Sequence, residues 1–176
     1  MSMYFIRHGE TYWNKLGKVQ GITDIELTEE GIRQAKEAAI SAEKLKLDIV
    51  ISSPLKRALK TAEIISKHCK CELIIESDLA ERNFGSYEGI SHKNINWDEF
   101  WSKEAEKGVE GVEKCEDFLA RIRNVTSLIF SKYEDKNVLL VSHGGFYKVI
   151  CNIGVYFDKI DLTTTRFLEN CEIIKI

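Results

Sequence analysis

The chain has 176 residues, of which 44% are hydrophobic, and this is enough for one compact domain with a sizeable core. The formal net charge is −3 and basic residues are mixed with acidic ones along most of the chain, so a nucleic-acid partner is not expected. No apolar run approaches the roughly 20 residues of a membrane-spanning helix and the N-terminus lacks a signal-peptide layout, so we expect a cytoplasmic protein without a membrane partner.

Five short apolar runs read as β-strands, at residues 3–6, 48–52, 71–76, 137–142 and 171–176. Helical periodicity separates the first four. One helix is expected to follow Thr28 as its N-cap and to bury alanines up to Ala42, and a second to be capped by Ser53 with Pro54 at its first position. A third helix before residue 137 is marked by Phe118, Ile122, Val125 and Ile129, and a fourth is expected from Phe146. This alternation predicts an α/β fold over residues 1–176: a single three-layer domain with a mostly parallel sheet and helices on both faces.

The segment from 83 to 112 has no clear assignment. It contains glycine-marked turns and three aromatic residues, Trp97, Phe100 and Trp101, at helical i, i+3, i+4 spacing. The favoured interpretation is a short helix packed on the core by its aromatic side chains. An aromatic wall around a substrate is the alternative, and both could hold, so we treat 83–112 as a variable, cap-like segment.

The cysteines suggest reduced thiols rather than disulfides. They are odd in number and scattered, at Cys69, Cys71, Cys115, Cys151 and Cys171. His68 with Cys69 and Cys71 forms one tight cluster, but no second pair stands at zinc-ligand spacing, so neither a metal nor another cofactor is expected.

Arginine, histidine and glycine recur where three predicted strands end. The first strand runs into Arg7-His8-Gly9, the second is followed by Arg57, and the fourth by His143-Gly144-Gly145. The carboxyl ends of parallel strands share one sheet edge, where α/β proteins bind ligands. Arginine forks and glycine backbone N–H groups suit a phosphate monoester dianion. A salt-bridged arginine pair is the structural alternative.

Phosphoryl transfer needs a nucleophile and a proton donor. The chain has no GxxxxGK[ST] loop and no aspartate cluster suited to magnesium, which leaves a histidine as covalent nucleophile. Nearby Arg7 and Arg57 would lower its pKa and keep it unprotonated. Glu81, just past the third strand, is the expected proton donor, and Glu88 competes for that role.

At this point the motifs resemble the histidine phosphatase superfamily, the phosphoglycerate mutase-like group with two catalytic histidines. The resemblance is carried, in order, by RHGET with WN and QGITDIELTEEGIRQA, by SSPLKRALKTAE, by LAERNFGSYEG and by VLLVSHGG. It implies that His8 becomes phosphorylated, that Arg7, Arg57 and His143 hold the phosphoryl group, and that Glu81 donates the proton. It also implies that Asn14, the Gln20-Gly21 turn and Gly144 border the substrate, with Thr11 in support.

One motif departs from the family pattern. Many relatives carry Gly-Glu-Ser before the helix that precedes the second histidine, whereas this chain reads Gly111-Val112-Glu113-Lys114. The contacts of that serine are therefore in question, although the spacing to Asp117, Phe118 and Arg121 is kept. Glu113 could border the pocket, but a helix-start charge is the favoured interpretation.

These residues predict a metal-independent phosphomonoesterase that hydrolyses a small phosphorylated metabolite. The dedicated mutases that resemble this sequence are longer, which favours a phosphatase over phosphoglycerate mutase-type transfer. A non-catalytic phospholigand sensor is the third hypothesis. Selectivity is expected from the 83–112 aromatics or from Tyr12 and Trp13, and the sequence sets neither the substrate nor the oligomeric state.

Overall fold

The computed structural model describes residues 2–96, 101, 109–151 and 167–176. They form a five-stranded sheet with the order β3-β2-β4-β1-β5. The strands are β1 (Ser2–Arg7), β2 (Ile49–Ser52), β3 (Glu72–Ile75), β4 (Asn137–Ser142) and β5 (Ile173–Lys175). The first four pair in parallel and β5 pairs antiparallel with β1, which confirms the predicted strands and the mostly parallel sheet.

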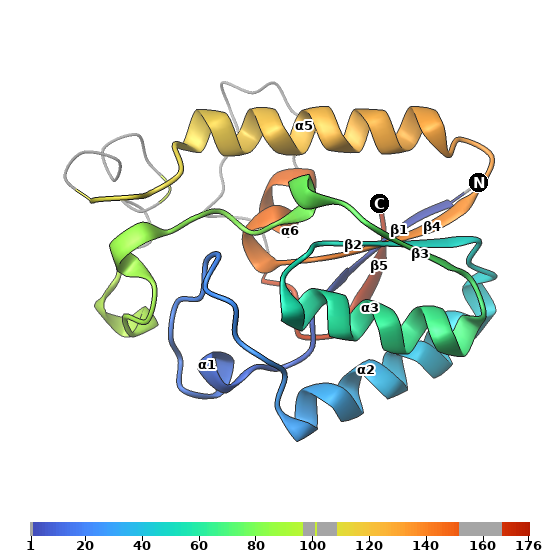
Figure 1. Ribbon diagram of the computed structural model, residues 1–176, viewed down its shortest axis with the longest axis horizontal. Coiled ribbons are helices and arrows are strands. Elements are labelled where there is room, and N and C mark those ends of the chain that lie inside the picture. The colour runs from blue at the N-terminus through green and yellow to red at the C-terminus, as the bar shows by residue number, and fades with distance from the viewer. Residues whose placement is uncertain (1, 97–100, 102–108, 152–166) are drawn as a thin grey trace.

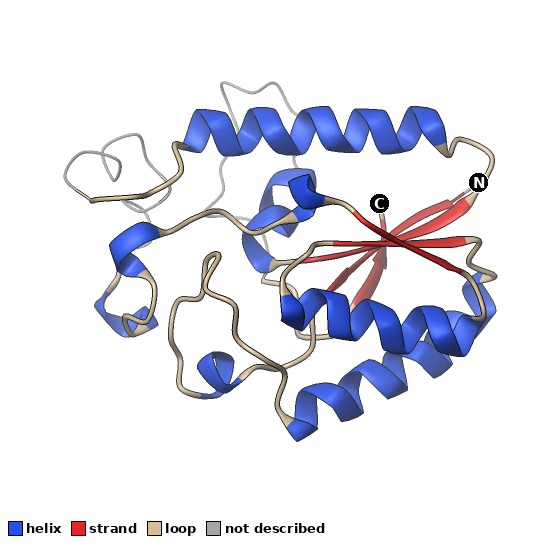
Figure 2. Cartoon of the chain, viewed as in Figure 1, coloured by secondary structure: helices blue, strands red, loops and turns tan. Residues whose placement is uncertain are grey.

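Helices cover both faces of the sheet, as predicted. The α-helices are α1 (Tyr12–Lys15), α2 (Glu29–Ala42), α3 (Lys56–Cys69), α5 (Cys115–Lys132) and α6 (Gly144–Ile150), and the 3₁₀ helices are η1 (Glu43–Leu45), η2 (Ser77–Leu79), η3 (Gly85–Tyr87) and η4 (His92–Asn94). Figure 1 shows α2 and α3 below the sheet and α5 and α6 above it. Figure 2 shows the strands as the middle layer of this three-layer arrangement.

The central strands are buried on both faces, which explains their continuous apolar runs. Side chains alternate along each strand, so Phe5 and Leu140 join the core under α5 and α6, whereas Ile6 and Leu139 join the core under α2 and α3. All four are fully buried. The rigid sheet thereby fixes the positions at which β1, β2 and β4 end.

Two helix starts differ from the prediction. Thr28 caps α2, accepting from Gly31 N at 3.0 Å, as expected. Ser53, in contrast, does not cap α3, which begins at Lys56 after Leu55, and the Ser53 hydroxyl bonds to His143 Nε2 at 2.7 Å. The first N–H of α3 is satisfied instead by Asp24, at 2.7 Å. The helix α6 begins at Gly144, directly after β4, rather than at Phe146.

Described residues of the 83–112 segment form a small apolar cluster with Val19, and Trp101 packs against both this cluster and the main core. Val19, Phe84 and Ile95 are buried there, and Trp101 packs edge-on against Phe84 with ring centroids 6.1 Å apart. This fits the favoured packing role for Trp101, which also lines the pocket described below, as the alternative interpretation expected. Trp97 and Phe100 lie outside the described residues. None of the described helices is long and apolar enough to cross a membrane.

Candidate active site

A pocket of about 470 Å³ opens where the carboxyl ends of the parallel strands meet. Among the predicted site residues it is lined by Arg7, His8, Asn14, Gln20, Arg57, Glu81 and Gly144. It is also lined by Lys18, Val19, Phe84, His92, Trp101, Gly145, Lys148 and Phe167. His143 and Gly21 do not line it, although both contact residues that do.

The imidazole of His8 is buried and held in one tautomer. Its Nδ1 lies 2.8 Å from the carbonyl oxygen of Gly9, so Nδ1 carries the proton and donates it, and Nε2 keeps its lone pair. Burial first, and then the charges of Arg57 and Arg7, hold the pKa of His8 well below its usual value of 6.5. His8 is therefore neutral at physiological pH, as a nucleophile must be.

The two arginines are anchored by their terminal nitrogens to backbone carbonyls. Arg57 donates to Thr23 O at 2.9 Å and to Gly21 O at 2.6 Å, and Arg7 donates to Leu168 O at 2.8 Å. Burial lowers the pKa of Arg57 to about 10, so the group stays cationic. The Nε atoms of Arg7 and Arg57 are buried without a partner among the described residues. Both arginines thus keep a donor available to an anion.

Gly21 acts on this site through Arg57 rather than by lining it. Its φ of +54° favours glycine, and a Cβ there would lie 2.0 Å from the Glu88 carboxylate. Thr11 lies behind Gln20: its hydroxyl is buried and donates to Gln20 Oε1 at 3.0 Å while it caps α1.

His143 lies fully buried beside His8, with ring centroids 5.2 Å apart. Its Nε2 bonds to the Ser53 hydroxyl, and its Nδ1 is a third buried nitrogen without a partner in the described chain. Burial, followed by the charge of Arg57 and by His8, holds the pKa of His143 well below 6.5. The Ser53 hydroxyl accepts from Leu55 N at 3.3 Å and can donate its own proton to His143 Nε2. In that arrangement the ring proton of His143 lies on Nδ1.

Glu81 enters from the loop after η2 and meets the start of α6. Its oxygens accept from Gly145 N at 2.8 Å and from Arg82 N at 3.0 Å. These bonds and the arginines favour the carboxylate, but burial outweighs them and raises the pKa of Glu81 above its usual 4.5. A buried carboxyl with a raised pKa, in the same pocket as His8, suits a proton donor.

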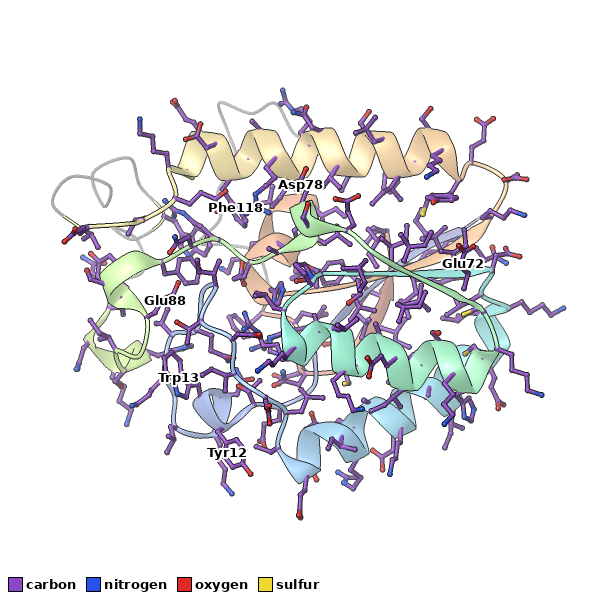
Figure 3. The ribbon with its side chains drawn as sticks, in the orientation of Figure 1. Tyr12, Trp13, Glu72, Asp78, Glu88 and Phe118 are labelled. Atoms are coloured by element: carbon purple, nitrogen blue, oxygen red, sulfur yellow. The ribbon has the colours of Figure 1, made fainter. Side chains whose placement is uncertain are left out.

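Glu88, the competing carboxylate, has a structural role. It accepts from the backbone N–H groups of Ile22, Thr23 and Phe84 at 2.8–3.0 Å, and also from the Thr23 hydroxyl. It does not line the pocket. Figure 3 shows Glu88 where the 83–96 segment approaches the loop that precedes α2. Glu88 therefore ties these two loops together.

The departure at Glu113 and Lys114 affects the support of the acid loop. Lys114 is the N-cap of α5 and makes no side-chain cap bond. Glu113, just before it, pairs bidentately with Arg121 at 3.0 and 2.9 Å. Arg121 in turn donates to the carbonyls of Asp78 and Ala80 at 2.8 and 2.9 Å. Glu113 does not line the pocket but steadies the chain leading into Glu81.

The C-terminal segment contacts the carboxyl end of β1. Asn170 Nδ2 donates to His8 O at 2.7 Å, and Cys171 N donates to Arg7 O at 2.9 Å. The Phe167 ring lies 4.7 Å from the Arg7 guanidinium carbon. The sequence-based reasoning missed these residues, since nothing in a strand-like C-terminal run marks them as neighbours of β1.

Tyr12 and Trp13 do not line the pocket. Tyr12, the first residue of α1, is 58% exposed and lies at the outer edge of the molecule (Figure 3). Trp13 packs under the ammonium group of Lys18, which lies 5.8 Å from the ring centroid. Lys18 and Lys148, both missed from sequence, do line the pocket. Lys148 could have been found, because it follows Gly144 by one helical turn.

The tight His68 and cysteine cluster is not built as a metal site. His68 Nε2 bonds to Glu43 at 2.7 Å instead. Within the described part of the chain, no group of three or more histidine, cysteine, aspartate or glutamate side chains could hold a metal ion.

Comparison with known proteins identifies the family of the chain. The profile of the histidine phosphatase superfamily (branch 1) matches residues 3–176. The chain is 35% identical to the uncharacterized phosphatase PhoE of Bacillus subtilis, covering 94% of this chain and 83% of that protein. It is 34% identical to the probable phosphoglycerate mutase GpmB of Escherichia coli O1:K1, covering 82% and 70%.

A similar solved structure is a phosphoserine phosphatase from Entamoeba histolytica in complex with 3-phosphoglyceric acid. It matches with a TM-score of 0.84 and 33% identity over 99% of this chain and 89% of that one. The fold expected from the motifs is thus confirmed. The chain belongs to the histidine phosphatase superfamily, branch 1, and is an enzyme of the phosphatase type.

Proposed function

We propose that the protein hydrolyses a small phosphorylated metabolite without a metal ion, through a phosphohistidine intermediate on His8. The observation that carries the proposal is the set of buried nitrogens around His8: Arg7 Nε, Arg57 Nε and His143 Nδ1 have no partner among the described residues. Buried donors without partners are costly, and a phosphoryl group would satisfy all of them.

In the first step His8 Nε2 attacks phosphorus and the bond between phosphorus and the leaving oxygen breaks. The electron pair goes to that oxygen, which takes the proton of Glu81. The Nε–H groups of Arg7 and Arg57 and the Nδ1–H of His143 stabilise the charge on the transferring group.

In the second step a water molecule attacks the phosphohistidine. Glu81, now a carboxylate, accepts the proton of the water as its oxygen bonds to phosphorus, and the nitrogen–phosphorus bond breaks. Inorganic phosphate leaves, and His8 and Glu81 return to their starting protonation states. Neutral His8 and protonated Glu81 are the states that their shifted pKa values favour.

The proposal is tested with 4-nitrophenyl phosphate in the presence of a chelator, comparing wild type with His8→Ala and Glu81→Gln. We expect His8→Ala to lose activity on the order of 10³-fold or more. His68→Ala, which changes an exposed histidine paired with Glu43, is the matched control and should retain activity. Acid-labile, base-stable labelling of the wild type would support the phosphohistidine, and equal turnover by His8→Ala would refute it.

Phosphoglycerate mutase-type transfer is the second candidate, because a relative at 34% identity is named a probable phosphoglycerate mutase. A mutase would interconvert 2- and 3-phosphoglycerate with little net release of phosphate, so an isomer assay beside a phosphate-release assay separates the two activities. Tight binding of phosphate esters with no turnover would indicate a sensor. A cytoplasmic location, without nucleic-acid or membrane partners, remains a prediction.

A further inference from the structure

The peptide group that follows His8 is hydrogen-bonded on both of its sides. Its carbonyl oxygen, His8 O, accepts from Asn170 Nδ2 at 2.7 Å, and its N–H, that of Gly9, donates to the Thr61 hydroxyl at 3.1 Å. We propose that Thr61 is a positioning residue for the reaction: it fixes this peptide group and thereby the orientation of the His8 imidazole. The inference rests on the proposed role of His8 as the nucleophile.

Thr61 lies one helical turn after Arg57 on α3 and is fully buried. Its hydroxyl donates to Arg57 O at 2.8 Å and accepts from Gly9 N, so the proton and a lone pair of the oxygen are both used. The first bond follows the common pattern of a helical threonine, which bonds to the carbonyl four residues earlier. The second joins residues 52 positions apart, and it connects the loop that carries His8 to the helical turn that carries Arg57.

Gly9 depends on such a bond because glycine is conformationally free. A Cβ at position 9 would lie 2.5 Å from Gly31 O, so the close approach of α2 requires a glycine there. Side-chain sterics therefore cannot restrict the backbone at this position. Hydrogen bonds do so instead: the N–H of Gly9 is held by Thr61, and the next N–H, that of Glu10, is held by Gln34 Oε1 at 2.9 Å.

The carbonyl of Gly9 decides which nitrogen of His8 carries the ring proton. It accepts from His8 Nδ1 at 2.8 Å, which leaves the lone pair on Nε2. Without the Thr61 hydroxyl the buried N–H of Gly9 would lose its partner, a state costly enough for the peptide group to turn toward another acceptor. The carbonyl of Gly9 would turn with it, and Nδ1 would lose the acceptor that holds the reactive tautomer.

The same bond fixes where the nucleophilic Nε2 lies relative to Arg57. The N–H of Gly9 and the carbonyl of Arg57 meet at one atom, Thr61 Oγ1, so the nucleophile and a proposed phosphate ligand share one support. A displacement of about 1 Å between reacting atoms costs on the order of 10²-fold in rate. The two pocket arginines keep their own anchors at Gly21 and Leu168. Loss of the hydroxyl should therefore lower kcat far more than it raises KM.

The test uses Thr61→Val, which replaces the hydroxyl by a methyl group, and Thr61→Ser, which keeps the hydroxyl. Thr126→Val is the matched control. Thr126 is 1% exposed and its hydroxyl donates to Ile122 O at 2.6 Å in the same four-residue pattern, but it lies on α5, across the sheet from α3 (Figure 1). With saturating 4-nitrophenyl phosphate and a chelator we expect kcat to fall by about 10²-fold in Thr61→Val, with KM little changed. Thr61→Ser and Thr126→Val should both stay close to wild type.

A second measurement does not depend on turnover. In protein with ¹⁵N-labelled histidine, the ring-nitrogen shifts of His8, assigned with His8→Ala, report which nitrogen carries the proton. We expect the proton on Nδ1 in the wild type and in Thr126→Val, and a new population with the proton on Nε2 in Thr61→Val. Asn170→Ala removes the other bond of the same peptide group and should show the same new population, so it takes the place of Thr61→Val if that variant does not fold.

The two readouts separate a positioning role from a merely structural one. An unchanged His8 tautomer in Thr61→Val would overturn the positioning role, and so would a loss of kcat no larger than that in Thr126→Val. An equal loss in Thr61→Ser and Thr61→Val would also overturn it, because the hydroxyl would then not carry the effect. None of these results would touch the phosphatase proposal, which depends on the loss of turnover in His8→Ala. Turnover by His8→Ala, with a tautomer shift in Thr61→Val, would refute the phosphohistidine mechanism and leave Thr61 as the residue that orients His8.

Discussion

The change Gly145→Ala tests the role of Glu81 without altering the carboxyl itself. A Cβ at position 145 would lie 2.4 Å from Glu81 Oε1 and 3.1 Å from its carboxyl carbon. Ordinary contact begins at 3.4 Å, so the carboxyl must retreat by about 1 Å, and a displacement of this size costs about 10²-fold in rate when the group takes part in the reaction. We expect kcat to fall by about that factor.

The pH profile gives a second, independent readout of the same change. The Gly145 N–H bond lowers the pKa of Glu81, so weakening this bond should raise that pKa further. The proton donor would stay protonated to a higher pH, and the alkaline limb of kcat should move upward. The loss should be larger for an alkyl phosphate than for 4-nitrophenyl phosphate, whose leaving group needs less protonation.

Gly144→Ala is the comparison variant, because its Cβ would meet Phe167 and Arg7 at 3.7 and 3.8 Å, ordinary contact distances. It should cost clearly less than Gly145→Ala and leave the alkaline limb in place. If both variants lost activity equally, or if Gly145→Ala reduced both substrates alike with an unmoved pH profile, Glu81 would not be the general acid.

Three further predictions concern the groups around the pocket. The pKa values of His8 and His143 are lowered in the folded protein, so the unfolded chain takes up more protons than the folded one below about pH 6.5. The free energy of unfolding should therefore decrease as the pH is lowered below about 6.5. Urea midpoints measured over this range check the prediction, and the decrease should be smaller in His143→Asn. Asn170→Ala removes the 2.7 Å bond to His8 O and should lower kcat by about tenfold with little change in KM, as measured with saturating aryl phosphate. Glu113→Ala breaks a half-buried pair with Arg121 and should lower the free energy of unfolding by about 1–3 kcal/mol, whereas Glu37→Ala, on the exposed face of α2, should change the urea midpoint little.

The sheet was predictable because its strands carry strong local signals. β2 and β4 are buried on both faces, so their apolar runs stand out from the flanking helices. The residues at the strand ends were predictable for the same reason: once the strands are placed, parallel pairing brings Arg7 and His143 to one edge. The predicted helix start at Ser53 was wrong. A serine before a proline is a common helix cap, so the local sequence favoured it, but here Ser53 bonds to His143, which is 90 positions away and has no local signal.

The rest of the pocket depends on contacts that have no local signature. Lys18 looks like one of many solvated lysines, and its place is set by Trp13 and by the pairing with Ser91, more than 70 residues away. Phe167 belongs to no motif and reaches Arg7 because β5 pairs antiparallel with β1. Pocket residues that are placed by long-range contacts are therefore harder to read from sequence than those that stand in motifs at the strand ends.

The choice between Glu81 and Glu88 shows what geometry adds to a motif that contains both. Each carboxylate accepts backbone N–H bonds, but their surroundings differ. Glu88 holds two loops together and does not line the pocket, so its oxygens accept backbone hydrogen bonds and do not face a substrate. Glu81 accepts from the first turn of α6, the element that also presents Gly144 to the pocket, so the start of α6 positions the carboxyl that we propose as the proton donor at the edge where we propose that phosphate binds.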